Sequence, residues 1–282
     1  MKHLKTVLEL ATAYLEKHKI ERARYSSEQL LAHSLEMKPI ELYMHHDRPM
    51  EEEELVVFRK GLKRKITGEP LEYILGCIEF YHCRIKTGPA ALIPRQETEI
   101  LLDLVNARLD GSERTVLDLC TGSGCLAIGL KKAQPHLQLT AVDLSVEALA
   151  LAKENAEINQ MPIEWLHGDL IEPVRERKFD LVLCNPPYIA EKEYEGLSAS
   201  VRDFEPKIAL VSGESGYEFY ERLSRELPQI LFPNAKVFFE IGKGQGAGLL
   251  KLFSSKNWKD SKVEPDWAGH DRFFSSISLE NE

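Results

Sequence analysis

The sequence has few cysteines, no long apolar run and no excess of basic residues, and each absence excludes a class of protein. Its 282 residues contain five cysteines, an odd number without a Cys-x-x-Cys pair. This usage disfavours a disulfide framework and a metal site, so we expect buried thiols, a reducing compartment and no metal. No stretch approaches membrane-spanning length, and no apolar signal-peptide core follows the N-terminus. We therefore expect a cytoplasmic protein without membrane contacts.

The charge balance argues against a protein that grips long nucleic acids. The formal net charge is −9 at pH 7, whereas phosphate contacts require a basic surface. The one basic cluster, at residues 60–65, ends a helix-like stretch that begins with glutamates at residues 51–54. Because acids at the start and bases at the end complement the helix dipole, a helix terminus explains the cluster better than a nucleic-acid patch. We expect a monomer without direct nucleic-acid contacts.

The pattern of apolar residues divides the chain into three parts. Residues 1–76 read as all helix, with an apparent capping box at Ser26-x-x-Gln29, and predict a small domain that contacts a partner. Residues 77–93 contain two short strand-like runs and predict a β-hairpin linker. Along residues 94–282, strand-like runs alternate with helical patterns. This alternation predicts an α/β domain with a mostly parallel sheet and helices on both faces.

A glycine-rich turn follows the first strand-like run of the third part. Asp118-Leu119-Cys120-Thr121-Gly122-Ser123-Gly124 leads from a strand through the turn into a helix. Gly122 and Gly124 permit positive φ and let a ligand lie against bare backbone. Asp143 ends the next strand, where a carboxylate can accept both hydroxyls of a ribose, and Ser145 is the expected cap of the following helix. These features predict a nucleoside-containing cofactor. A nicotinamide dinucleotide stays open, because residues 122–127 also fit the G-x-G-x-x-A fingerprint.

A second motif favours S-adenosylmethionine as the cofactor. Asn185-Pro186-Pro187-Tyr188 directly follows the apolar run at residues 179–184. Its two prolines remove two backbone donors and fix two φ angles, so the turn offers carbonyl oxygens, one carboxamide and one aromatic face. These groups suit a planar, neutral N–H₂ group, either an amide or the amine of a base. Asp118 would repel a pyrophosphate but could order the loop or meet a cationic amino-acid end.

At these residues the chain resembles the PrmC/HemK family of peptide chain release factor N5-glutamine methyltransferases. The most specific part of the resemblance combines residues 93–99 with residues 202–206. The resemblance implies a class I, Rossmann-like, seven-stranded methyltransferase domain. It also implies methylation of a glutamine amide in a release factor's Gly-Gly-Gln loop by S-adenosyl-L-methionine, leaving S-adenosyl-L-homocysteine. The chain departs from the family pattern at Cys120 (usually glycine), at Gln96 (usually proline) and at Leu170, where some relatives carry an aromatic residue.

The resemblance further implies roles for individual residues. In this family's scheme the Asn185 carboxamide oxygen and the Pro186 carbonyl accept the N–H bonds of the target amide, while Tyr188 stacks on the amide or fences its edge. Arg95, with neighbouring glutamates, forms either a charged entrance network or a helix start. The expected cofactor-binding residues are Asp118, Cys120, Thr121, Gly122, Ser123, Gly124, Asp143, Asp169, Leu170 and Asn185. The expected substrate-binding residues are Leu92, Arg95, Asn185, Pro186, Pro187 and Tyr188.

Four alternatives stay open from the sequence. A ribosomal-protein glutamine methyltransferase shares most of these motifs. An adenine-N6 nucleic-acid methyltransferase shares residues 185–188, although the acidic charge disfavours it. A nicotinamide-dependent dehydrogenase and a non-catalytic binding module would each keep the nucleoside pocket.

Overall fold

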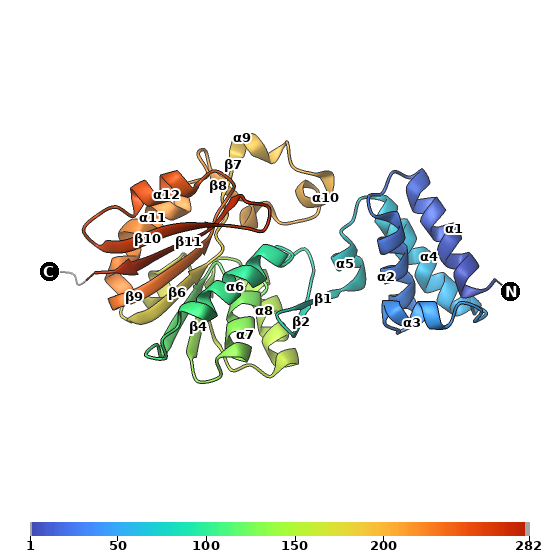
Figure 1. Cartoon of the computed structure of the whole chain (residues 1–282), viewed down its shortest axis with the longest axis horizontal. Helices are drawn as coiled ribbons and strands as arrows, with labels where there is room; N and C mark the ends of the chain where they lie inside the picture. Colours follow the sequence, from blue (N-terminus) through green and yellow to red (C-terminus); the bar gives the residue numbers. More distant parts are fainter. Residues whose placement is uncertain (1, 280–282) are drawn as a thin grey trace. The chain divides into compact units, whose positions relative to one another are not determined.

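The computed structural model describes residues 2–279, which form two compact units (Figure 1). Of the described residues, one unit comprises 2–77 with 198–204, and the other comprises 78–197 with 205–279. Among the described residues, no helix is long and apolar enough to cross a membrane. All five cysteines are free thiols, and Cys83, Cys125 and Cys184 are buried. The buried thiols predicted from the sequence are therefore found at three of the five positions.

The first unit is helical, as its sequence predicts. Its helices are α1 (Leu4–Lys17), α2 (Ala23–Ser34), α3 (Pro39–Met44), α4 (Glu52–Ile66), α5 (Leu71–Leu75) and the short α10 (Ala199–Arg202). Glutamates fill the first turn of α4 and bases fill its last turn, which confirms that the basic cluster ends a helix. The predicted capping box at Ser26 is wrong. Ser26 lies buried inside α2, which begins one turn earlier because Ala23 already belongs to its apolar face.

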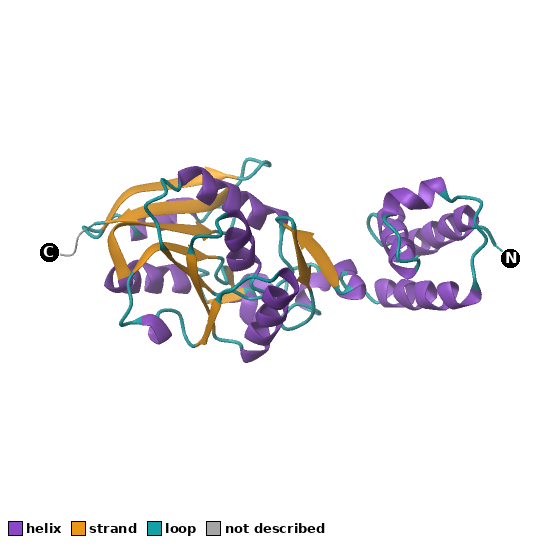
Figure 2. Ribbon diagram, turned by 90° about the horizontal axis from the view of Figure 1, so that it is seen from below, coloured by secondary structure: helices purple, strands orange, loops and turns teal. Residues whose placement is uncertain are grey.

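A β-hairpin, β1 (Cys77–Phe80) and β2 (Cys83–Lys86), precedes strands and helices that alternate along the chain. Figure 2 distinguishes these strands and helices by colour. The strands that follow are β3 (Thr115–Leu119), β4 (Gln138–Asp143), β5 (Glu164–His167), β6 (Phe179–Cys184), β7 (Ile189–Ala190), β8 (Val211–Gly213), β9 (Leu231–Glu240), β10 (Trp258–Pro265) and β11 (Asp271–Ser278). The helices are α6 (Gln96–Arg108), α7 (Cys125–Ala133), α8 (Val146–Asn159), α9 (Glu191–Tyr194), α11 (Glu218–Glu226) and α12 (Gly246–Leu252). Short 3-10 turns lie at η1 (Glu172–Val174), η2 (Lys207–Ala209) and η3 (Leu227–Ile230).

The central sheet has seven strands in the order β10-β11-β9-β6-β3-β4-β5. Strands β5, β4, β3, β6 and β9 pair in parallel, while β11 is antiparallel to both β9 and β10. The predicted seven-stranded, mostly parallel methyltransferase sheet is therefore confirmed. In an open sheet of this kind, ligands bind beyond the carboxyl ends of the strands, where the strand order reverses. Here the order reverses at β3, between β4 and β6.

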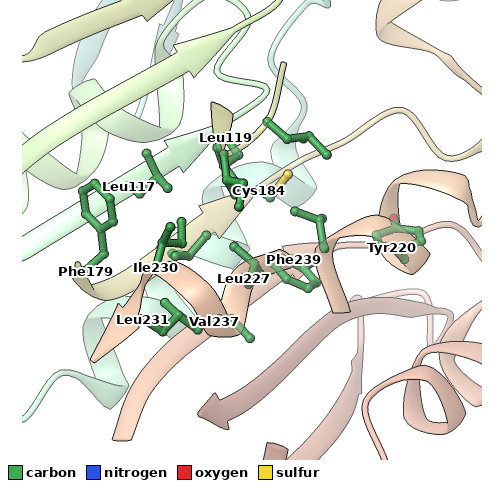
Figure 3. Close-up of a cluster of buried hydrophobic side chains, with 14 of the residues drawn as sticks. Leu117, Leu119, Phe179, Cys184, Tyr220, Leu227, Ile230, Leu231, Val237 and Phe239 are labelled. Atoms are coloured by element: carbon green, nitrogen blue, oxygen red, sulfur yellow. The ribbon is translucent and has the colours of Figure 1, made fainter. Parts of the chain in front are cut away.

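Each face of the sheet carries its own apolar core, because successive residues of a strand point to opposite faces. In β6, Val182 and Cys184 join the core formed with α11 and α12, whereas Leu181 and Leu183 join the core beneath α6, α7 and α8. Figure 3 shows the first core, with Leu227 and Tyr220 lying close to the strands. Both faces are buried, which explains why β6 reads as a continuous apolar run.

Candidate active site

A cavity lies beyond the carboxyl ends of β3, β4 and β6. Its volume is about 920 Å³, a figure that includes the open solvent at its mouth. Several residues predicted from the sequence line it: Leu92, Cys120, Thr121, Gly122, Ser123, Asp143, Asp169, Leu170, Asn185 and Pro187. Asp118, Gly124, Arg95, Pro186 and Tyr188 are absent from the described lining, although all lie in or beside the same loops.

The two glycines of the loop after β3 have different neighbours. Gly122 (φ 57°) lines the cavity, and a methyl group on it would have no atom closer than 3.9 Å. Gly124 (φ 80°) faces the protein instead, because a methyl group there would lie 2.8 Å from the Trp165 ring and 3.1 Å from Ala152. Gly122 thus offers bare backbone to a ligand, while Gly124 permits close packing of α7. Cys120 also has a positive φ, of 56°, a conformation that favours the glycine usual in the family.

Asp118 organises the loop from beneath. Its side chain is fully buried, and Oδ2 accepts a hydrogen bond from Thr121 Oγ1 at 2.5 Å. No described group hydrogen-bonds Oδ1. Burial raises the pKa of Asp118 to about 7, an effect that the Thr121 hydroxyl partly offsets. The carboxyl therefore orders the turn and keeps one oxygen without a described partner.

Asp143 joins the loop after β3 to the helix after β4. Its Oδ2 accepts from Gly122 N at 2.7 Å and its Oδ1 accepts from Ser145 N at 2.9 Å. Burial raises the pKa of Asp143, while these backbone donors lower it. Each carboxylate oxygen can accept a second hydrogen bond, so the group retains capacity for ligand hydroxyls. The Ser145 side chain accepts from Ala148 N at 3.1 Å, which confirms the predicted cap of α8.

Asp169 and Leu170 form the cavity wall after β5. Asp169 Oδ1 lies 2.9 Å from Arg222 Nη1 on α11, in a half-buried ion pair. Leu170 is buried with a φ of 47°, an uncommon conformation for a branched side chain. The structure therefore places an apolar leucine and a paired carboxylate where the resemblance implied cofactor contacts.

Asn185 has a fixed orientation at the end of β6. Its Nδ2 donates to Glu240 Oε2 at 3.0 Å and lies 3.4 Å from Thr98 Oγ1. The Thr98 hydroxyl in turn donates to Glu240 Oε2 at 2.7 Å. The Asn185 Oδ1 atom is buried, and no described group donates to it. The side chain thus keeps a carbonyl oxygen available as an acceptor beside the cavity.

Tyr188 is half-buried and packs against the core formed with α11 and α12. Gln245 holds its carbonyl, with Nε2 donating to Tyr188 O at 3.0 Å and to Gly216 O at 3.1 Å. Burial raises the pKa of Tyr188 to about 12, and the nearby Glu240 carboxylate adds to the effect. The phenol is therefore neutral at physiological pH and can serve as a flat apolar surface, but not as a base.

Arg95 belongs to a structural ion pair. Its guanidinium binds Glu205, whose other oxygen accepts from Ile93 N at 3.0 Å. Glu205 is almost fully buried, so this pair ties residues 93–95 to the segment that follows α10. Arg95 is thus held beside the Leu92 wall of the cavity rather than in its lining.

Reasoning from the sequence did not identify Thr98 and Glu240 as site residues. Both are buried polar groups, one on the first turn of α6 and the other at the end of β9. The available signal was a charged residue ending an apolar strand, since a buried acid needs a partner. Among residues 2–279, no group of three or more His, Cys, Asp or Glu side chains could hold a metal ion.

The chain matches known proteins along most of its length. A family model described as the PrmC N-terminal domain matches residues 6–76, and one described as the methyltransferase small domain matches residues 95–201. A protein named release factor glutamine methyltransferase from Geobacter sulfurreducens is 36% identical over 269 residues, covering 95% of this chain and 94% of that protein. One of the same name from Enterococcus faecalis is 40% identical over 232 residues, covering 82% of this chain and 83% of that protein.

A solved structure supports the fold. A methyltransferase from Pyrococcus furiosus aligns with a TM-score of 0.53 at 19% identity, over 70% of this chain and 89% of that chain. At this identity the likeness concerns the architecture alone.

Proposed function

Because the chain belongs to the family of release factor glutamine methyltransferases, we propose that it methylates the side-chain amide nitrogen of a glutamine in a peptide chain release factor, using S-adenosyl-L-methionine. The family resemblance read from the sequence is confirmed, and with it the assignment as a methyltransferase. Membership excludes the dehydrogenase and the binding module as alternatives. The target within a Gly-Gly-Gln loop is part of the proposal.

The observation that carries this proposal is the state of Asn185. Its Nδ2 is engaged by Glu240, while its Oδ1 is buried without a described donor beside the cavity. A buried carbonyl oxygen without a donor is costly, so it fits a site that receives an N–H group from a ligand. A glutamine amide supplies such a group, and so does the amine of adenine.

The residues at the carboxyl ends of β3, β4 and β5 suit S-adenosyl-L-methionine. Gly122 leaves room for a ligand against the backbone, Asp143 has spare acceptor capacity for ribose hydroxyls, and Leu170 offers an apolar surface for a base. The free Oδ1 of Asp118 can order the loop or attract a cationic group. When bound, the cofactor supplies an electrophilic methyl group on a positively charged sulfur.

The protein's own groups favour the reaction by positioning and by charge. A glutamine amide nitrogen is a weak nucleophile, because its lone pair is delocalised into the carbonyl. The Asn185 oxygen and the Pro186 carbonyl accept its N–H bonds, and both interactions strengthen as positive charge develops on the nitrogen. Tyr188 limits the position of the flat amide. The alkylated nitrogen then releases its proton to solvent, so no strong base is needed.

The remaining assignments stay part of the proposal. The helical domain at residues 1–76 recognises the release factor, residues 77–93 link it to the methyltransferase domain at 94–282, and the chain acts as a monomer. A substrate of the translation machinery implies a cytoplasmic location.

The decisive experiment measures transfer of a labelled methyl group to purified release factor, with a ribosomal protein and DNA as competing acceptors. We expect label on one glutamine of the release factor, located by mass spectrometry and lost when that glutamine is replaced. Label confined to the ribosomal protein or to DNA would instead identify one of the two alternatives that share residues 185–188.

A further inference from the structure

Glu240 is a buried carboxylate whose side-chain partners are both neutral. The residue is 1% exposed, and its Oε2 accepts from the Thr98 hydroxyl at 2.7 Å and from Asn185 Nδ2 at 3.0 Å. Within residues 2–279 it forms no ion pair. The guanidinium of Arg272 donates to Ile241 O at 3.2 Å and pairs with Asp266, and that of Arg95 pairs with Glu205.

Stability alone does not favour a carboxylate at this position. A buried carboxylate without a counter-ion lowers the stability of the fold, and an apolar residue of similar size would pack without that penalty. What the carboxylate does provide is a charged acceptor for two donors, the Thr98 hydroxyl and the amide nitrogen of Asn185.

We propose that Glu240 is a positioning residue for amide methylation: it holds Asn185 Nδ2 so that Oδ1 alone faces the substrate, and its charge makes Oδ1 a stronger acceptor. This inference rests on the proposed function.

The orientation matters because a carboxamide has two similar ends. If Asn185 rotated by half a turn, its NH₂ group would meet the NH₂ group of the target glutamine, donor against donor. A carboxylate can only accept hydrogen bonds, so Glu240 allows one orientation. A charge-assisted bond to Nδ2 also polarises the amide toward its oxygen, where positive charge on the substrate nitrogen must be stabilised.

The positioning role of Glu240 should depend on pH, because the side chain changes its protonation state in an accessible range. Burial raises the pKa of Glu240 to about 6, and the nearby Arg272 and the Thr98 hydroxyl limit the rise. Above that pH the group is charged and accepts from both donors; below it, one oxygen becomes a donor and the anchor weakens. Other groups facing it are Arg95 and Glu97 at the start of α6, Tyr188 after β6, Tyr220 on α11 and Cys125 on α7.

The kinetic test compares Glu240→Gln and Glu240→Ala with Glu113→Gln. Glu113 is an equally buried carboxylate that pairs with Lys236 at the opposite end of the sheet, so its variant controls for loss of a buried charge. Because Glu240 acts through Asn185, we expect a smaller effect on kcat than the roughly 10²–10³-fold cost of deleting a direct donor: about 10-fold in Glu240→Gln and about 10²-fold in Glu240→Ala. Cofactor Kd should stay within threefold, roughly, in all variants, and Glu113→Gln should keep the parent kcat. The parent kcat should fall below about pH 6, and Glu240→Gln should lose that decline.

A second readout does not depend on the substrate. In a nitrogen-15 spectrum, the Asn185 side-chain NH₂ signal, identified by its loss in Asn185→Ala, should shift with a midpoint near pH 6 and stop shifting in Glu240→Gln. If the parent methylates release factor but both Glu240 variants keep its kcat, or if the signal does not titrate, the inference is overturned. If the parent methylates no release factor, the proposed function fails, and the spectrum alone decides whether Glu240 anchors Asn185. If Glu240→Ala does not fold, Glu240→Gln carries the comparison.

Discussion

The burial of Asp118 should make the stability of this protein fall as pH rises through the weakly acidic range. Its carboxyl is fully buried, with a pKa of about 7 against an ordinary value of 3.8. In the unfolded chain the proton is lost near the ordinary value, whereas the folded chain keeps it until about pH 7. Between these limits the folded state binds more protons, so stability decreases with pH and then levels off.

The size of this loss of stability follows from the difference between the pKa values of Asp118 in the folded and unfolded chains. At about 1.4 kcal/mol for each pH unit, the full range corresponds to about 4 kcal/mol, and the part between pH 5 and pH 8 to about 3 kcal/mol. Asp118→Asn removes the titration and keeps an oxygen that can accept from Thr121. Its buried NH₂ group adds a penalty of about 1–3 kcal/mol that is independent of pH.

Urea unfolding of both proteins at four pH values from 5 to 8 measures the effect. We expect the free energy of unfolding of Asp118→Asn to gain about 3 kcal/mol relative to the parent over this range, whatever the offset at pH 5. Asp143 and Glu240 also titrate, but they are present in both proteins and largely cancel. Curves that run parallel over the whole range would refute the reasoning.

Three further predictions concern the site and its supports. Asn185→Ala should lower methyl transfer by about 10²–10³-fold with cofactor affinity changed only a few fold, as measured by single-turnover kinetics and calorimetry; a collapse of cofactor binding would make it a cofactor or structural group. Gly124→Ala should lower the free energy of unfolding, measured in urea, by about 2–4 kcal/mol, because the added methyl group meets the neighbouring indole. Gly122→Ala should lower it by only about 1 kcal/mol, but should weaken cofactor binding because the methyl group obstructs the cavity. Equal stability losses would contradict this assignment. A double-mutant cycle on Arg95→Ala and Glu205→Ala should give a coupling of at least about 1.5 kcal/mol, and additive effects would show that the pair is unimportant.

The fold was predictable because the residue pattern of most elements agrees with the structure that they form. The apolar runs that became β3, β4 and β6 are buried on both sides along most of their length, so their patterns are nearly continuous. The last two strands, β10 and β11, were not identified individually from the sequence. Strand β10 lies at an edge of the sheet, consists mostly of polar and charged residues and contains register shifts, so it has no clear apolar period.

The site was predictable where one segment carries the information and unpredictable where several segments meet. Residues 118–124 and 185–188 form the expected turns. The carboxylate that holds Asn185 comes from another strand, and its other partner, Thr98, is separated from Glu240 by 142 residues. Only the position of β9 beside β6 brings them together. In the same way, the packing role of Gly124 depends on Trp165, which no local pattern near residue 124 reveals.

The position of β9 in the sheet determines the order in which the parts of the site form while the chain is being synthesised. Glu240 lies opposite Phe273 of β11, and Ile241 N donates to Arg272 O at 2.8 Å. When a nascent chain has emerged through residue 241, it already carries the expected cofactor-binding loops after β3, β4 and β5, as well as residues 185–188. One edge of β9, the strand that bears Glu240, is then still unpaired. That edge closes only when residues 271–278 arrive. The contact between Glu240 and Asn185 is therefore the last part of the site to become rigid. Chains shortened at the C-terminal side should bind the cofactor but fail to transfer its methyl group.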